Sequence, residues 1–372
     1  MLSSVSHTAP TRDSEDDSPN VDSEPSADGS PRISVVVCTL NGARRLGRCL
    51  AAVRRQSLGE GLQLIVVDDG STDNSSEVAA AYGAEVIRHA ANRGLAAARN
   101  TGIEAARAPI VATLDDDCEP EPEWAERLLG GFAEGVVGVG GLAVPASDGG
   151  YFAGYLERNN PLLPLEIDLA SNTGIAYRFV LYLLRNARAL PSGERAVHAF
   201  ATANGAFQTA VLRKLGGFDE RFRSEEGGED LDLCLRIGDE YGTGALRFEP
   251  SAVIHHHFDT DPRALLSRCR SYGMGAARLY SQRTDIPPTI FPFPGLIAGL
   301  LVWSRGRASR VAAVLLLPQL LFSKGCQNAL QRSSLAPLLD CYVKLAEEAN
   351  LNLGFAVGLW RFRNRRTIDT AS

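Results

Sequence analysis

The sequence predicts an α/β fold with a mostly parallel central sheet flanked by helices. Short β-branched runs, such as 33–37, alternate with segments of helical spacing, such as 43–56. This alternation is typical of parallel strands joined by right-handed crossovers. Polar clusters at 39–41, 68–73 and 115–117 each follow a predicted strand. Open sheets of this kind bind their ligands beyond the carboxyl ends of the strands, so these clusters are the first candidates for a site.

The first half of the chain has the clearest pattern. Each predicted strand is a short, mostly apolar run, and the run at 33–37 is β-branched, as expected for a strand buried on both faces. The predicted strands are 33–37, 62–67, 84–87 and 110–114. The predicted helices between them are 43–56, 75–82 and 94–106.

The second half is less regular. The predicted strands are 136–144 and a pair at 246–249 and 252–256, with a further short segment at 200–204. The predicted helices are one around Ile175–Arg188, one at 209–215 and one from Glu229 to about Tyr241. Residues 32–282 are therefore expected to form one α/β domain.

Both ends of the chain differ from this domain. Residues 1–31 are rich in Ser, Pro, Asp and Glu and are expected to be a disordered acidic tail. Residues 283–372 are expected to form a helical extension with two apolar stretches, 295–303 and 311–322. These have nine and twelve residues, too few for a bilayer span of roughly 20. Two interpretations remain open: buried core helices, or a helical hairpin in the membrane interface.

Charge and cysteine content limit the classes of protein. Residues 1–32 carry seven acids and two bases, which accounts for -5 of the formal charge of -6. The rest of the chain is nearly neutral and has no basic excess, so a nucleic-acid partner is not expected. Seven cysteines without a CxxC pair do not suggest disulfides or zinc, and no signal peptide is recognisable. We expect a cytoplasmic protein, with peripheral contact at the inner face of the plasma membrane as an open alternative.

The acidic run Asp115-Asp116-Asp117 is the strongest chemical signal. Three adjacent carboxylates repel one another unless a cation or solvent relieves the repulsion. Mg²⁺ or Mn²⁺ prefers oxygen ligands and could bind the run and phosphate oxygens together. The alternative is a solvated acidic turn, which is common for such a motif.

Three further clusters add candidate residues. In the run at 68–73, Asp69 could accept hydrogen bonds from a base or ribose, while Asp73 could cap the next helix. Gly227 and Gly228 precede a helix whose first turn carries Asp230, where the helix dipole favours an ionised general base. Three histidines end the last predicted strand. Strand alternation places His255 and His257 on one face and His256 on the other, and one of them could complete a metal site.

Taken together, these clusters resemble the family-2 glycosyltransferases, which have the GT-A fold. The resemblance covers about 33–280 and rests on several blocks in order. The blocks are 35–41 (VVVCTLN), 66–73 (VVDDGSTD), 92–102 (NRGLAAARNTG), 114–117 (LDDD), 216–220 (GGFDE) and 228–230 (GED).

The resemblance implies an inverting transfer from a nucleotide-diphosphate sugar, most often UDP-linked, to an acceptor hydroxyl. We expect a saccharide or a lipid-linked acceptor. It implies that Asp69 contacts the base, Asp115 lies on the ribose side and Asp230 deprotonates the acceptor hydroxyl. Asp117 would be the main ligand of Mn²⁺ or Mg²⁺, with His255 as a further ligand. The remaining residues of the matching blocks expected to bind the nucleotide sugar are Thr39, Asn41, Arg99 and Glu229.

The sequence departs from the family pattern in two respects. Cys38 and Leu40 stand where the first-strand motif usually has Pro and Tyr, so no aromatic ring is available there to stack on a base. The Gln-x-x-Arg-Trp motif of processive members is absent, so transfer of one sugar per encounter is expected. Two alternatives are a sugar-phosphate nucleotidyltransferase and a non-catalytic nucleotide-sugar-binding protein of the same fold.

Overall fold

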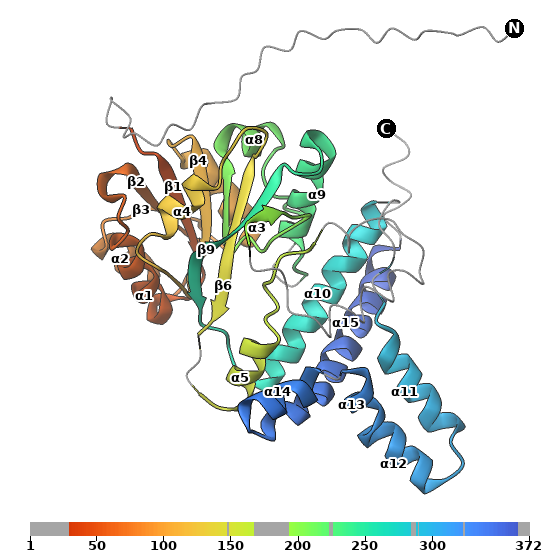
Figure 1. The fold of residues 1–372 in the computed structure, drawn as a ribbon. Coiled ribbons are helices and arrows are strands. Elements are labelled where there is room, and N and C mark those ends of the chain that lie inside the picture. Colours follow the sequence, from red (N-terminus) through yellow and green to blue (C-terminus); the bar gives the residue numbers. More distant parts are fainter. Residues whose placement is uncertain are drawn as a thin grey trace, which may run out of the picture.

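The computed structural model describes residues 30–146, 149–166, 193–222, 226–283, 288, 290–322 and 324–363. Most of the acidic N-terminal segment and the predicted helix around Ile175–Arg188 lie outside the described residues. A central sheet with helices on both faces forms the larger part of the molecule, and long C-terminal helices stand beside it (Figure 1). This is the mixed α/β architecture that the sequence predicts.

Four parallel strands form one half of the sheet, in the spatial order β3-β2-β1-β4. Their bounds are β1 Ile33–Thr39, β2 Leu62–Asp68, β3 Glu85–Arg88 and β4 Ile110–Asp115. The register aligns the carboxyl ends, because Thr39 lies opposite Asp68 and Cys38 lies opposite Asp115. The predicted polar clusters therefore meet at one edge of the sheet.

Helices cover both faces of this sheet, and β1 alternates between them. Val35 and Val37 pack into the core on one face, while Val36 and Cys38 pack into the core on the other. The first face is covered by α1 (Ala43–Arg54), α2 (Ser75–Ala81) and α4 (Trp124–Gly130). The second is covered by α3 (Leu95–Ala105), α8 (Thr209–Lys214) and α9 (Glu229–Tyr241). Burial on both faces explains why these strands read as continuous apolar runs.

The other half of the sheet is mixed. It contains β5 (Cys118–Pro120), β6 (Gly138–Pro145), β7 (Arg195–Ala196), β8 (Asn204–Gln208) and β9 (Leu246–His256). β8 is antiparallel to both β4 and β6, and β9 is parallel to β6. The expectation of two separate strands at 246–249 and 252–256 is wrong. They form one strand whose register shifts where Pro250, which has no N–H to donate, interrupts the ladder.

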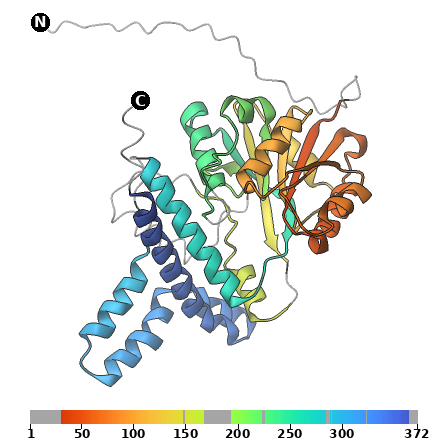
Figure 2. The same cartoon turned by 180° about the vertical axis from the view of Figure 1, so that it is seen from behind.

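The C-terminal helices build a second layer beside the sheet. They are α10 (Pro262–Gln282), α11 (Pro292–Trp303), α12 (Arg307–Leu315), α13 (Leu317–Leu321), α14 (Lys324–Arg332) and α15 (Asp340–Phe362). Figures 1 and 2 show α10 and α15 side by side. Glycines permit this close approach: a Cβ on Gly273 would lie 2.1 Å from the Leu351 carbonyl oxygen, and one on Gly354 would lie 2.1 Å from that of Arg270.

Helix α5 (Tyr151–Arg158) joins this layer to the end of β6. Both Arg158 and its partner Asp340 on α15 are buried, and they form an ion pair of 2.7 Å. The Tyr155 hydroxyl donates to Glu347 at 2.7 Å. Among the described helices, none combines the length and the hydropathy that crossing a bilayer requires.

Candidate functional site

The acidic run turns sharply between β4 and β5, so its three carboxylates point in different directions. Asp116 is buried and accepts hydrogen bonds from the Thr39 hydroxyl and from Arg45 Nε, each at 2.6 Å. A Cβ on Gly42 would lie 2.2 Å from a carboxylate oxygen of Asp116, so a larger residue there would displace this contact. Asp116 therefore fixes the start of α1 against the strand ends, a role that the sequence did not suggest. Thr39 is engaged in the same contact.

Asp117 is the member of the run with the most perturbed charge. Burial raises the pKa of its carboxyl group to about 7, and the carboxylates of Asp115 and Asp116 contribute in the same direction. The His257 amide donates to the Asp117 carbonyl oxygen at 2.9 Å, which fixes the turn against the end of β9. A carboxyl group held in this way gains from a nearby cation.

His256, and not His255, lies beside this carboxylate. His256 Nε2 is 3.6 Å from Asp117 Oδ1. The predicted alternation is present, but His255 and His257 point to the opposite side, toward Glu121 at 3.5 Å and Glu119 at 2.7 Å. The physical reason is register: Cys118, the residue after Asp117, pairs with His256. The structure therefore brings His256 to Asp117, where the sequence analysis expected His255.

The pair formed by Asp117 and His256 fits a divalent cation. Burial lowers the pKa of His256 to about 4, so the imidazole is neutral near pH 7, as a metal ligand must be. Ligands about 2.1 Å from one ion lie roughly 3 to 4 Å apart, which includes the observed separation. Cys118 is also near, but burial raises the pKa of its thiol well above the ordinary value, and a neutral thiol is a poor ligand.

Arg99 of α3 connects the acidic run to the start of α9. Its guanidinium is buried and donates to Asp115 at 3.0 Å and to Glu229 at 2.9 Å. Burial alone would lower the pKa of Arg99, but the two carboxylates raise it above its ordinary value. The guanidinium also lies over the Phe218 ring at 5.2 Å. Three residues predicted for the donor site are thus held in one charged cluster.

Asp230 follows Glu229 in the first turn of α9. Burial raises the pKa of its carboxyl group to about 6, Glu229 adds to the shift and Arg99 opposes it. Asp230 Oδ1 accepts a hydrogen bond from the Leu231 amide at 2.8 Å, which fixes its rotamer. The carboxyl group is thus ionised at neutral pH and retains a proton affinity suited to a general base.

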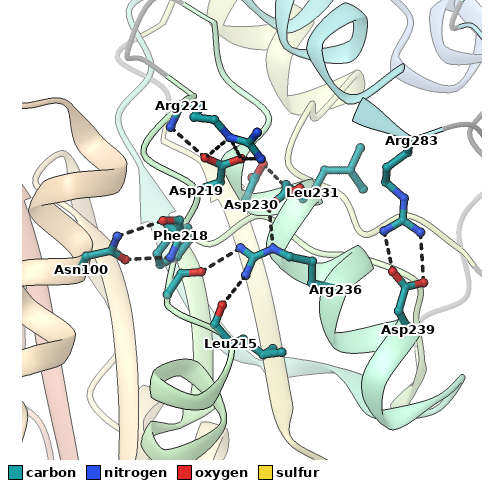
Figure 3. A network of polar contacts seen from close by, with 12 residues as sticks. Asn100, Leu215, Phe218, Asp219, Arg221, Asp230, Leu231, Arg236, Asp239 and Arg283 are labelled. Carbon is teal, nitrogen blue, oxygen red and sulfur yellow. Dashed lines mark hydrogen bonds and ion pairs between the residues drawn. The ribbon is translucent and has the colours of Figure 1, made fainter. Parts of the chain in front are cut away.

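The loop before α9 is anchored from two sides (Figure 3). The Asn100 amide donates to the Phe218 carbonyl oxygen at 2.9 Å and accepts from the Phe218 amide at 2.7 Å. Arg236 of α9 donates to the carbonyl oxygens of Leu215 and Gly217. These contacts explain the Gly-Gly-Phe-Asp-Glu block as a support for the helix that carries Asp230.

Asp69 and Asn41 make contacts that hold the backbone of the site. Asp69 is buried and accepts hydrogen bonds from the amides of Arg93 and Gly94, each at 2.9 Å, and it contacts His89 at 2.6 Å. The Asn41 side chain accepts from the Thr72 amide at 2.8 Å. Both residues lie at the predicted edge, where they position the loops after β1 and β2.

The structure adds Arg268 of α10, a residue that the sequence analysis missed. The Phe258 ring stacks on His256 at 4.0 Å, and the Arg268 guanidinium lies over the same ring at 4.9 Å. One terminal nitrogen of Arg268 is buried without a hydrogen-bond partner in the part of the chain that is described. Arg268 belongs to no recognisable motif, and only its position in the fold brings it to the metal side of the site.

Comparisons with known proteins show which family this chain resembles. The family model described as "Glycosyl transferase family 2" matches residues 34–199. The "Pre-mycofactocin glycosyltransferase" of Mycobacterium tuberculosis is 32% identical over 297 residues, which cover 78% of this chain and 57% of that protein. The "Glucosyl-dolichyl phosphate glucuronosyltransferase" of Haloferax volcanii is 25% identical over 68% of this chain and 80% of its own length.

A solved structure supports the fold. The "Mannosyltransferase PcManGT from Pyrobaculum calidifontis in complex with GDP-Man and Mn2+" superposes on this chain with a TM-score of 0.52 and 20% sequence identity. The superposition covers 89% of this chain and 88% of the mannosyltransferase chain. The chain spans a little over half the length of the mycobacterial relative. The chain belongs to the family-2 glycosyltransferases and has their GT-A fold.

Proposed function

We propose that this protein transfers one sugar from a nucleotide-diphosphate sugar, UDP-linked, to an acceptor hydroxyl with inversion. One observation carries the proposal. Arg99 donates hydrogen bonds to Asp115, in the same acidic run as the candidate metal ligand Asp117, and to Glu229, the residue before the candidate base Asp230. The acidic run and the candidate base therefore share one edge of the sheet. A nucleotidyltransferase or a simple nucleotide-sugar binder has no use for a base in this position.

Each residue of the edge has a role in the proposed reaction. Asp117 and His256 would hold Mn²⁺ or Mg²⁺, which supplies positive charge to the departing diphosphate. Asp230 accepts the proton of the acceptor hydroxyl as that oxygen attacks the anomeric carbon on the face opposite the leaving group. Arg99 keeps Asp115 and Glu229 in place around the donor, and Thr39, Asn41 and Asp69 support the loops around the nucleotide.

Arg268 contributes a second positive charge in this proposal. Its buried nitrogen has an unused donor near the candidate metal ligands, and a diphosphate oxygen is the kind of acceptor that an arginine prefers. A guanidinium placed there would bind the donor and stabilise the leaving group as its charge increases.

The acceptor is proposed to be a saccharide or a lipid-linked saccharide. The Haloferax volcanii relative is named for a lipid phosphate, dolichyl phosphate, which supports the second class. We place the protein in the cytoplasm, in peripheral contact with the inner face of the plasma membrane.

The test is release of a nucleoside diphosphate. The purified protein would be incubated with Mn²⁺ and a panel of UDP-, GDP- and dTDP-sugars, with saccharide and lipid-linked acceptors. Release that depends on metal and is lost in Asp230→Asn is the expected result. No release with any donor and acceptor would contradict the proposal, and pyrophosphate from a nucleoside triphosphate and a sugar phosphate would indicate a nucleotidyltransferase.

A further inference from the structure

Helices α11 and α12, with the turn 304–306 between them, form a hairpin arm. The arm projects from α15, away from the sheet (Figures 1 and 2). Its root is packed: the Phe293 and Phe322 rings meet edge to face at 5.3 Å, and both are buried next to Cys341. The Phe291 amide donates to Asn352 of α15 at 2.8 Å. The arm is thus firmly attached at one end.

The far end of the arm exposes large apolar side chains. At the tip, 79% of Val302 and 87% of Trp303 is exposed. Further exposed apolar side chains of the arm and of α13 are Leu296, Leu300, Val311, Val314, Leu315, Leu316 and Leu320. Single exposed apolar residues are ordinary, but a contiguous set on one projecting element indicates a binding surface.

The charge of the arm identifies the partner. Residues 286–339 contain no Asp or Glu, whereas the whole chain has a formal charge of -6. The bases in this segment are Arg305, Arg307, Arg310, Lys324 and Arg332. Arg305 and Arg307 are exposed and follow Trp303 by two and four residues. Apolar side chains with an adjacent tryptophan and arginines, and without acids, match the boundary between acyl chains and anionic headgroups.

We propose that the hairpin arm inserts its tip into the surface of an anionic phospholipid bilayer. The inference gives a location and a lipid charge to the peripheral contact proposed above, and it does not depend on glycosyl transfer. Helices α11 and α12 have 12 and 9 residues, so the arm lies in the interface and does not cross it. A second copy of the chain is a less suitable partner for the tip, since two positive tips would repel each other.

This docking would place the active site near the membrane surface. The arm is rooted on α15, and α15 packs along α10. On its other side α10 lies against the loop before Asp230, since a Cβ on Gly275 would be 2.0 Å from the Gly227 carbonyl oxygen. Two packed helices therefore connect the inserted tip to the loop that leads into α9, the helix with the candidate base, which suits an acceptor held in the bilayer.

The experiment measures sedimentation of the full-length protein with extruded vesicles, without donor or metal. Vesicles of phosphatidylcholine alone would be compared with vesicles that contain roughly one quarter phosphatidylglycerol. The variants are Trp303→Ser and the double variant Arg305→Gln/Arg307→Gln. Trp360→Ser is the matched control, because Trp360 is also exposed but lies on α15, outside the arm.

The wild-type protein should bind the anionic vesicles and bind the neutral ones at least tenfold more weakly. Each arginine near an anionic surface contributes about fivefold in affinity, so the double variant should lose roughly 30-fold. The affinity of Trp303→Ser for anionic vesicles should be lower by about tenfold or more, and Trp360→Ser should bind these vesicles like the wild type. Thermal melting and nucleotide-sugar binding should be the same for all variants, which excludes misfolding as the cause.

Three results would overturn the proposal. One is the absence of binding to anionic vesicles, and another is an equal loss in Trp303→Ser and Trp360→Ser. The third is a dimer in light scattering that Trp303→Ser converts to a monomer while vesicle binding is unchanged. The transferase assay is separate, so failure of the membrane proposal leaves the proposed reaction standing, and the reverse also applies.

Discussion

Replacement of Asp117 by asparagine should make the metal-free protein more stable while it removes the response to metal. The wild-type carboxylate is ionised at pH 8 although burial and two neighbouring carboxylates disfavour its charge. Asparagine has nearly the same shape and no charge, so the variant no longer has this cost. The same substitution removes an anionic oxygen that Mn²⁺ would bind.

The magnitude follows from the size of the shift. The pKa of Asp117 rises from the ordinary 3.8 to about 7, and each unit corresponds to about 1.4 kcal/mol of free energy. A raised pKa lowers stability progressively as the pH rises from about 4 to about 7, and above pH 7 the full cost is present. Part of the Asp117 side chain is exposed and part of the repulsion belongs to its neighbours. We therefore expect Asp117→Asn to gain roughly half of the free energy that the pKa shift corresponds to, about 2 kcal/mol. That is an increase in Tm of about 4–8 °C.

The assay is thermal unfolding at pH 8 in EDTA and then in Mn²⁺ with a nucleoside diphosphate. The wild type should gain stability on addition of metal, and Asp117→Asn should gain little. Asp68→Asn is the control, because the Asp68 carboxylate is also buried at a strand end but has a lowered pKa, with hydrogen bonds from Ser71 and Ser76. Asp68→Asn should lower the free energy of unfolding by about 1–3 kcal/mol. A variant at 117 that is less stable than the wild type in EDTA, or equally stabilised by metal, would refute the reasoning.

Three further predictions concern the charged groups around the site. Asp230→Asn should bind donor normally but have a kcat that is roughly 10²- to 10⁴-fold lower than that of the wild type. In the wild type, kcat should fall about tenfold per pH unit below the Asp230 pKa of about 6, because the protonated carboxyl group cannot act as a base. Arg99→Ala should lower the free energy of unfolding, measured in urea, by about 3 kcal/mol, because the carboxylates of Asp115 and Glu229 lose their partner. Arg107→Ala is the control: it breaks the exposed ion pair with Glu85 and should lower the free energy of unfolding by less than about 1 kcal/mol. Arg268→Gln should raise the donor KM by about ten- to a hundredfold with little change in urea stability; an unchanged KM would count against its contact with the diphosphate.

The parallel half of the fold could be predicted because burial on both faces produces a distinct sequence pattern. The run at 33–37 is apolar except at Ser34, since alternate side chains enter two different cores. The mixed half gave weaker signals. β5 has only three residues, and its role in turning the acidic run depends on pairing with a strand more than a hundred residues later.

The site was predictable as a set of positions and less so in the direction of each side chain. Alternation correctly separated His256 from His255 and His257, but the register between β5 and β9 decides which of the two faces meets Asp117. Asp116 had no role in the sequence, yet its contacts with Thr39 and Arg45 come from elements that only the fold brings together. Local pattern contains neither strand register nor long-range hydrogen bonds.

The glycine contacts along α10 limit how this chain could exchange parts with a relative. Gly273 and Gly275 leave no room for a side chain, the first against α15 and the second against the loop before Asp230. A recombination point between β9 and α10 would therefore separate α10 from the loop before Asp230, two surfaces that are complementary in shape down to single backbone atoms. Chimaeras designed with a relative should therefore keep the loop before Asp230, α10 and α15 from the same parent.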